Sequence, residues 1–191
     1  MDSKTYLIKE LLSDLSSVGL NSIADRIIQE ALPLEDLLEL NFHSDRRISF
    51  RSAWVMEKIA YRDITLIAPV FSQILERYNT LHNPSLARHY NKILLLVFEM
   101  KTKNTLPQEL NTILENTDRE KIIEGCFKWI LMPKCPVAAL VWSIEILMYH
   151  TESHPWLKEE LPPIIQKLSL NTTSGQKNYC SKAYKRLMKN H

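Results

Sequence analysis

The most constraining feature of this chain is a repeating pattern, in which pairs of short amphipathic segments follow one another and each pair is opened by a turn residue. The most regular pair runs from Arg46 to Leu81, and the pattern starts again at Asn83. Apolar residues recur every three to four positions, which is typical of helices with one buried side. A period in the high thirties is typical of stacked helical hairpins that bury their apolar sides only against neighbours. The sequence therefore predicts an all-α fold, a right-handed α-α superhelix of about five helical hairpins.

Glycine and proline usage supports helices over strands. The 191 residues include three glycines and nine prolines. Sheets joined by tight turns depend on glycine, whereas proline in a first helical turn costs little because its missing N–H would be unpaired there anyway. We therefore expect the prolines at the starts and corners of helices: Pro33, Pro69, Pro84, Pro107, Pro133, Pro136, Pro155, Pro162 and Pro163.

Capping residues and apolar spacing together predict where the helices lie. Ser, Asp and Asn before an apolar periodic run indicate a helix start. Gly19 is read as ending the first helix and Asn21 as capping the second, and the nearly all-apolar segment 137–150 is expected between neighbouring helices. We expect one domain over residues 1–191, with 1–42 as N-terminal cap and first repeat and 174–190 as C-terminal capping helix. The expected helices are 3–17, 22–32, 34–41, 45–60, 64–78, 86–101, 107–114, 119–131, 137–150, 155–168 and 174–189.

Cysteine usage and hydropathy indicate the compartment. Cys126, Cys135 and Cys180 are odd in number and widely spaced, which argues against a disulfide framework. No charged-then-apolar leader is visible and no apolar run approaches the roughly 20 residues of a membrane span. We therefore expect a cytoplasmic protein that has no membrane partner.

Net charge is small but unevenly distributed. The chain carries +2 overall, which disfavours a dedicated nucleic-acid binder. Residues 1–42 hold eight acids and three bases, whereas residues 171–191 hold five bases and no acid. The two ends are therefore either solvated caps of opposite charge or surfaces for head-to-tail association or for an acidic partner.

The search for chemistry finds no catalytic constellation. His150 and His154 have the spacing of helical metal ligands, but no third ligand is nearby, so we read them as two partly exposed histidines at a helix end. Ser174 and Lys177 match the spacing of some acyl-transfer nucleophiles without a second motif, and Ser174 is read as a helix cap. The sequence indicates no catalytic residue, no metal and no cofactor.

Cations recur near the openings of the first helices of the pairs. Arg51 and Arg88 lie 37 positions apart, and Lys182 opens a similar segment. Such cations either bind acids or helix C-terminal carbonyls of the adjacent repeat, or line a groove and hold an anionic ligand through paired hydrogen bonds. The sequence leaves both roles open.

Further candidates come from the tryptophans, the second helices and the basic tail. The tryptophans fit packing between repeats, or an exposed anchor, for which Trp54 is a candidate. Polar positions of the second helices are expected to line a concave surface: Gln73, Arg77, Glu109, Lys158 and Gln166. In the tail, Tyr179 and Tyr184 are read as packing and the cations mainly as a solvated cap, with anion contact as the alternative. The candidate binding residues are Arg51, Trp54, Arg77, Arg88, Lys182 and Arg186.

Several segments carry a resemblance to known proteins: 50–58, Arg88 with 92–94, 136–149 and 155–161. Through them the chain resembles the HEAT and armadillo-like class, and more narrowly small bacterial HEAT-like proteins of unassigned function, over about residues 20–190. Leu140 departs from the pattern where a basic residue is expected. The resemblance implies a helical repeat fold and brings no catalytic motif.

Three functions remain open at this point. The leading hypothesis is a non-enzymatic interaction or scaffold module that binds a protein or peptide on the concave surface of the stack. The alternative is a nucleic-acid-binding or DNA-repair role that uses the basic C-terminal helix, because HEAT-like folds include DNA glycosylases with a basic groove. The third is a small-molecule enzyme with a pocket between helices, which a buried carboxylate with a perturbed pKa would favour.

Overall fold

A computed structural model of the chain describes residues 2–13, 16–170 and 173–189, and every regular element in these ranges is a helix. The all-α prediction is confirmed. The helices are α1 (Ser3–Ser13), α2 (Ser17–Gln29), α3 (Leu34–Leu40), α4 (Arg46–Arg62), η1 (Ile64–Ile67), α5 (Ala68–Arg77), η2 (Tyr78–Thr80), α6 (Pro84–Thr102), α7 (Gln108–Glu115), α8 (Arg119–Ile130), α9 (Val137–His150), α10 (Trp156–Leu170) and α11 (Ser174–Lys189).

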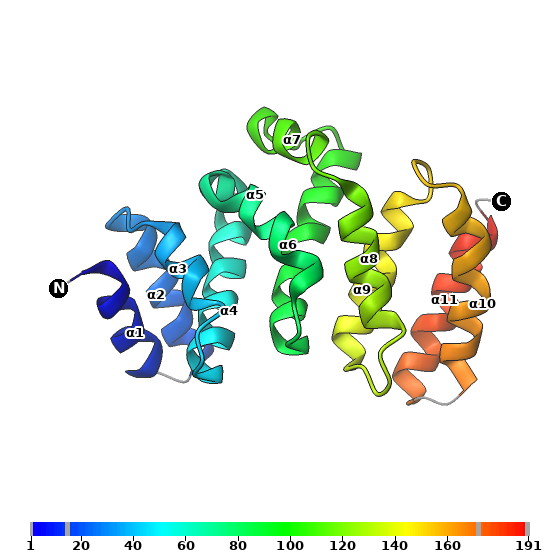
Figure 1. Cartoon of the computed structure of the whole chain (residues 1–191), viewed down its shortest axis with the longest axis horizontal. Coiled ribbons are helices and arrows are strands. Elements are labelled where there is room, and N and C mark those ends of the chain that lie inside the picture. Colours follow the sequence, from blue (N-terminus) through cyan, green and yellow to red (C-terminus); the bar gives the residue numbers. More distant parts are fainter. Residues whose placement is uncertain (1, 14–15, 171–172, 190–191) are drawn as a thin grey trace.

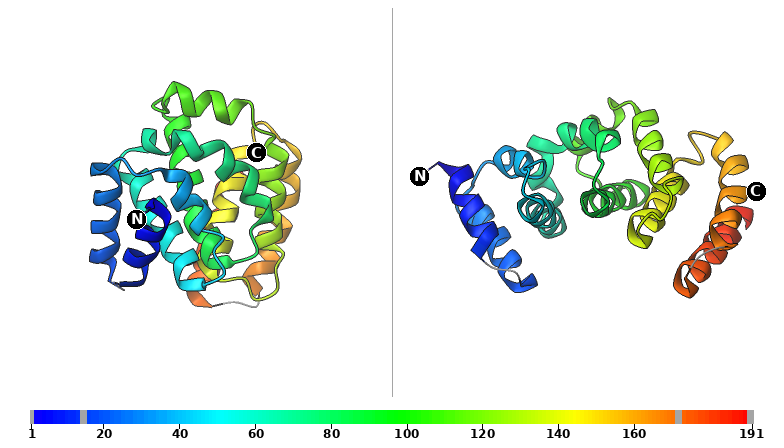
Figure 2. Two further views of the ribbon diagram at one scale, coloured as in Figure 1. Left: turned by 60° about the vertical axis from the view of Figure 1, so that its left-hand side comes forward. Right: turned by 60° about the horizontal axis from the view of Figure 1, so that its bottom comes forward.

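The helices form two layers along the long axis of the molecule (Figure 1). In the inner layer, α2, α4, α6, α9 and α11 pack side by side in this order, while α3, α5, α7, α8 and α10 form the outer layer. In the right-hand view of Figure 2 the two ends of the molecule curve toward the side on which α4, α6 and α9 lie. The sequence predicts the second helix of each pair on the concave side, whereas α5, α7 and α10 lie in the outer layer.

Short polar side chains start several helices as the sequence predicted. Asp45, Asp63, Asn83 and Asp118 each accept a hydrogen bond from the backbone N–H two residues later, at 2.8, 2.9, 2.9 and 3.1 Å. Each bond satisfies one of the N–H groups that a first helical turn leaves without a partner. These boundaries were predictable because capping depends only on local sequence.

The first turn of α2 differs from the prediction. Helix α1 ends at Ser13 rather than reaching residue 17, and residues 14 and 15 lie outside the described residues. The Ser16 hydroxyl caps α2 by accepting from the N–H of Gly19 at 2.9 Å, so glycine lies inside the helix instead of ending one. Asn21, the predicted cap, is also inside α2, and its side chain accepts from Lys58 at 2.8 Å.

Helix α10 contradicts the expectation that every proline marks a start or a corner. Pro162 and Pro163 lie within α10. A proline inside a helix removes a backbone hydrogen bond and crowds the preceding turn. Tight packing against α11 offsets this cost, because Leu157, Leu161 and Pro162 are buried.

A buried polar network joins the middle of the two layers. The Tyr78 hydroxyl donates to Asn91 Oδ1 at 2.6 Å and lies 3.2 Å from Cys126 Sγ. Asn91 donates in turn to Ser143 Oγ at 3.0 Å and to the Ala139 carbonyl at 3.2 Å. The network fixes η2, α6, α8 and α9 relative to one another, since buried polar groups are costly to leave unpaired.

Candidate binding face of the inner helices

Four helices of the inner layer carry charged and aromatic side chains on the side that faces away from the outer layer. On α4 these are Trp54 and Lys58, and on α6 they are Arg88 and Lys92. The remainder are Trp142 and Glu145 on α9, and Lys182 and Arg186 on α11. Within each pair the residues are three or four positions apart, which puts both on one side of their helix. None of the eight is buried. We call these residues the inner face.

Two cations from α6 lie over a tryptophan of α9. Arg88 Cζ lies 5.8 Å and Lys92 Nζ 5.3 Å from the centre of the Trp142 ring. On α4, Lys58 Nζ lies 5.4 Å from the Trp54 ring. Cations within about 6 Å of an aromatic ring are attracted by its negative face. The inner face therefore carries two ordered tryptophan–cation groups on nearby helices.

A buried acid holds one of these cations in place. Glu57 of α4 accepts from Lys92 Nζ at 2.5 Å and from Nδ1 of His89. Burial alone would raise the pKa of Glu57, but the bonds from His89 and Lys92 outweigh it and lower that pKa. Glu57 therefore stays ionised and fixes Lys92 over the Trp142 ring.

The His89 ring packs against Trp54. The two rings stack with centres 5.9 Å apart and an interplanar angle of 22°. Burial lowers the pKa of His89 despite the neighbouring Glu57 carboxylate, so the ring is neutral near pH 7. Its Nε2 atom is buried and, among the described residues, has no hydrogen-bond partner. The Glu57–His89 pair is thus enclosed beneath the inner face.

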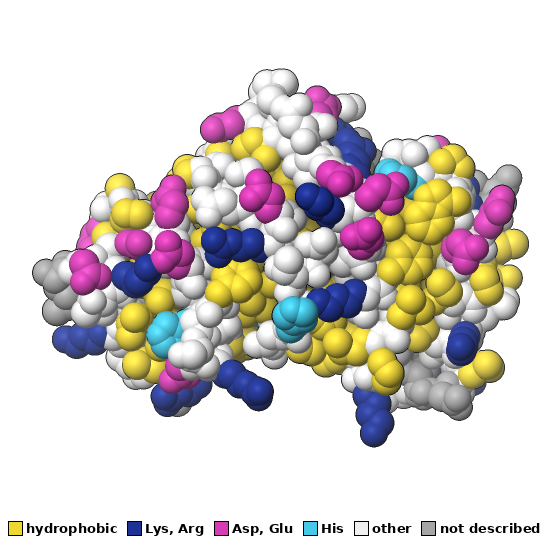
Figure 3. Space-filling view, viewed as in Figure 1, with side chains coloured by type: hydrophobic (Ala, Val, Ile, Leu, Met, Phe, Trp, Pro, Cys, Tyr) yellow, Lys and Arg dark blue, Asp and Glu magenta, His cyan; other side chains and the backbone are white. Residues whose placement is uncertain are grey.

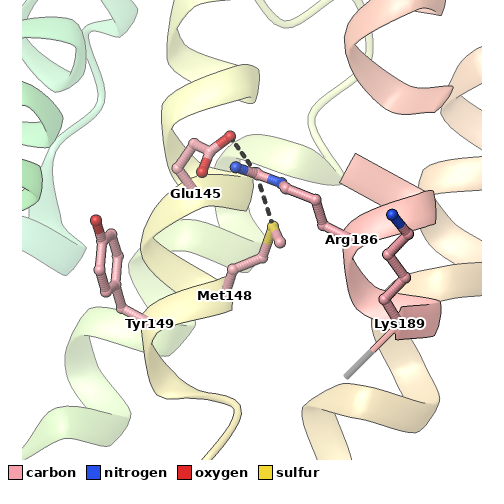
Figure 4. Close-up of a pocket in the computed structure, with 5 residues that line it drawn as sticks. All are labelled: Glu145, Met148, Tyr149, Arg186 and Lys189. Carbon is pink, nitrogen blue, oxygen red and sulfur yellow. Dashed lines mark hydrogen bonds and ion pairs between the residues drawn. The ribbon is translucent and has the colours of Figure 1, made fainter. Parts of the chain in front are cut away.

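A cleft of about 400 Å³ lies between α9 and α11 (Figure 4). Glu145, Met148 and Tyr149 line it from α9, while Arg186 and Lys189 line it from α11. Arg186 Nη2 donates to Glu145 Oε1 at 2.6 Å and lies 3.2 Å from Met148 Sδ. The same carboxylate oxygen accepts from the Tyr179 hydroxyl at 2.7 Å. The guanidinium of Arg186 is therefore held at the edge of the cleft.

The structure brings four of the six predicted site residues onto the inner face: Trp54, Arg88, Lys182 and Arg186. Arg51 is also on α4, but it is buried and donates to the Leu11 carbonyl in the last turn of α1. This contact corresponds to the first of the two roles considered for Arg51, in which the cation binds a C-terminal carbonyl of a neighbouring helix. Arg77 lies on α5 in the outer layer, where its guanidinium is 4.9 Å from the centre of the Phe42 ring. Arg51 and Arg88 match in sequence but not in environment.

Sequence reasoning missed Glu57, His89, Lys58, Lys92 and Trp142 as parts of this region. The sequence did contain an indication of this region. Trp54 and Lys58 are four positions apart, as are Arg88 and Lys92, and this spacing places each pair on one side of its helix. The repeat pattern that pairs Arg51 with Arg88 matches a buried position with an exposed one and therefore obscures this shared spacing.

The remaining sequence candidates lie elsewhere. The prediction that His150 is partly exposed is wrong, because the residue is buried at the end of α9 and donates from Nδ1 to the Ile146 carbonyl at 3.0 Å. His154 Nε2 pairs with Glu120 at 3.2 Å. In the described ranges no group of three or more His, Cys, Asp or Glu residues could hold a metal ion. Trp129 is fully buried.

An exposed aromatic contact also lies in the outer layer. Trp156 of α10 is 43% exposed and stacks on Phe127 of α8, with ring centres 5.7 Å apart. Figure 3 shows hydrophobic side chains gathered over this part of the molecule. This patch is an alternative candidate to the inner face as a binding surface.

Comparison with known proteins gives no match to a family model, to a curated protein or to a solved structure. Across the ranges that the structure describes, no helix combines the length and apolar character needed to cross a bilayer.

Proposed function

We propose that the chain is a non-enzymatic binding module whose inner face binds an extended segment of another protein. Its helices would form a right-handed α-α superhelix of the HEAT and armadillo-like kind, as the sequence resemblance implies. The successive packing of α2, α4, α6, α9 and α11 supports this proposal. Side-by-side helices of this kind offer one contact after another to an extended ligand.

The observation that carries the proposal is the group formed by Trp142, Arg88 and Lys92. Trp and Arg are enriched among the residues that dominate binding energy at protein interfaces. Trp142 is partly exposed, and the two cations over it come from the neighbouring helix. A partner that covers this group would contact α6 and α9 together. On the neighbouring helix α4, Lys58 lies over Trp54, and the Trp54 ring stacks on His89 of α6.

The buried carboxylate does not favour the enzyme hypothesis. Glu57 has a shifted pKa, which is often a mark of an active site. Its two oxygens, however, are occupied by Lys92 and His89, and the side chain is 8% exposed. A structural role that orders Lys92 accounts for this arrangement. We further propose that the module works in the cytoplasm, in line with its unpaired cysteines.

Nucleic-acid binding is the second candidate, and Trp142 is the observation that favours it. An exposed aromatic ring beside cations is a platform on which a base of a single strand can stack. The net charge of +2 weighs against this function.

Comparative capture of partners from cell extract tests the proposal. Immobilised wild-type protein is compared with Trp142→Ala/Arg88→Ala and with the outer-layer control Trp156→Ala/Lys121→Ala, before and after nuclease treatment. Lys121 is exposed on α8 and matches the loss of charge. We expect a protein that is retained by the wild type and by the control, lost with the inner-face variant, and unaffected by nuclease. Retention that depends on Trp156 rather than Trp142 would overturn the proposal, and release by nuclease would support the second candidate.

A further inference from the structure

We propose that the cleft between α9 and α11 binds carboxylate side chains, so that the segment bound by the inner face is acidic. This inference rests on the proposed function and specifies the chemistry of its partner. It concerns Lys182 and Arg186 of the inner face, together with Lys189, which lines the cleft beside Arg186.

Arg186 has hydrogen-bond donors that remain unused among the described residues. Its Nη2 atom binds Glu145 and Met148, while neither Nε nor Nη1 has a hydrogen-bond partner among the described residues. The side chain is 51% exposed and lines the cleft, so it is held in position without being buried. A guanidinium fixed at one end offers its other donors to a carboxylate in a geometry that favours paired hydrogen bonds.

The charge around the cleft is positive once existing pairs are taken into account. Glu145 is the acid that lines the cleft, and it is neutralised by Arg186 and hydrogen-bonded by Tyr179. Lys182, Arg186 and Lys189 are spaced along one side of α11, and the helix contains no acid from Ser174 to Lys189. Neither lysine has an ion-pair partner within the described ranges. This side of the inner face therefore complements a negatively charged segment.

The walls of the cleft favour a peptide over a nucleic acid. Met148 and the exposed ring of Tyr149 provide apolar contact beside the cations. An acidic peptide can place a carboxylate on Arg186 and an apolar side chain on Met148, and it carries less charge per length than a phosphate backbone. The apolar wall beside the cations is thus covered by an acidic peptide that carries apolar side chains and left uncovered by a phosphate backbone.

Fluorescence anisotropy with three labelled probes of equal length tests the inference. The probes are a peptide of alternating Glu and Leu, the same peptide with Gln in place of Glu, and single-stranded oligothymidylate. We expect the Glu peptide to bind best, and its affinity to fall as salt increases. The triple variant Lys182→Gln/Arg186→Gln/Lys189→Gln should weaken binding by about fivefold or more, and the control Lys121→Gln by less than about twofold.

Lys189→Gln alone guards against a folding defect, because this exposed residue ends α11. It should weaken the Glu peptide measurably while leaving thermal unfolding unchanged. Equal binding of the Glu and Gln peptides, no effect of the α11 variants, or tighter binding of oligothymidylate would each overturn the inference. The proposed function is judged separately, because a captured protein that still depends on Trp142 would leave it intact.

Discussion

Gly125 gives the sharpest test of how the two layers are held together. It lies inside α8, and a Cβ atom added to it would approach Tyr78 Cδ1 and Cε1 at 2.7 Å. The Tyr78 ring is fully buried and its hydroxyl is bound to Asn91 and Cys126. The ring therefore cannot move away from an alanine at 125 without disturbing these bonds.

The expected cost of Gly125→Ala follows from opposing terms. Overpacking of this kind costs about 1–3 kcal/mol, and a weakened buried hydrogen bond adds about 1 kcal/mol. Alanine gains about 1 kcal/mol over glycine within a helix. The net destabilisation is about 1–3 kcal/mol, which corresponds to a fall in melting temperature of about 2–12 °C for a chain of this size.

Thermal and urea unfolding monitored by circular dichroism provide the measurement. Gly175→Ala is the matched control, because a Cβ at Gly175 has no atom within 4 Å and the residue also lies in a helix. The control should be unchanged or stabilised by up to about 1 kcal/mol. In a Tyr78→Leu background the cost of Gly125→Ala should shrink, since the crowded ring is gone. Equal stability of the two alanine variants would refute the close packing of α8 on η2.

Three further predictions concern ionisable groups. Burial lowers the pKa of His150 to about 4 from 6.5, so its contribution to stability is complete above pH 6.5 and decreases by about 3 kcal/mol as the pH falls to 4. The free energy of unfolding of His150→Asn, measured with urea, should fall less between pH 7 and 4.5 than that of the wild type. Parallel plots of this free energy against pH would contradict the prediction. Glu57→Gln should lower the free energy of unfolding by about 1–3 kcal/mol, because a buried ionised acceptor is lost, whereas the exposed pair partner Glu99→Gln should change it by less than about 0.5 kcal/mol. In thiol labelling of the native protein at pH 8, Cys135 should react before Cys126, since burial raises the pKa of Cys126 to about 12 and that of Cys135 to about 11; the reverse order would contradict the burial of Cys126.

Local signals made most of the fold predictable. The segment 137–150 was expected as a helix between neighbours, and α9 has those bounds and packs on α6, α8, α10 and α11. The start of α2 was misplaced although its cap, Ser16, is a local signal, whereas the prolines of α10 required information from beyond the local sequence. Pro162 and Pro163 are tolerated inside α10 because that helix packs closely on α11, and no local pattern reports such packing.

The candidate site was less predictable because it depends on how each helix is rotated. Arg51 and Arg88 hold matching places in the repeat pattern, yet one is buried against α1 and the other is exposed over Trp142. A spacing shows which residues share a side of one helix, but it does not show which side faces solvent when neighbouring repeats differ. Glu57 and His89 meet only because α4 and α6 pack side by side, at a separation of 32 residues.

The cations of the inner layer fall into two groups: some form ion pairs between neighbouring helices and others do not. Arg62 binds Asp25 across α4 and α2 at 2.7 Å, Lys92 binds Glu57 across α6 and α4 at 2.5 Å, and Arg186 binds Glu145 across α11 and α9 at 2.6 Å. Each pair links neighbouring inner helices and thereby fixes the distance between the groups that they carry. Other cations of this layer, namely Arg88, Lys182 and Lys189, have no ion-pair partner in the part of the chain that the structure describes. Substituting a paired cation should therefore change both stability and binding, whereas substituting an unpaired one should change binding alone.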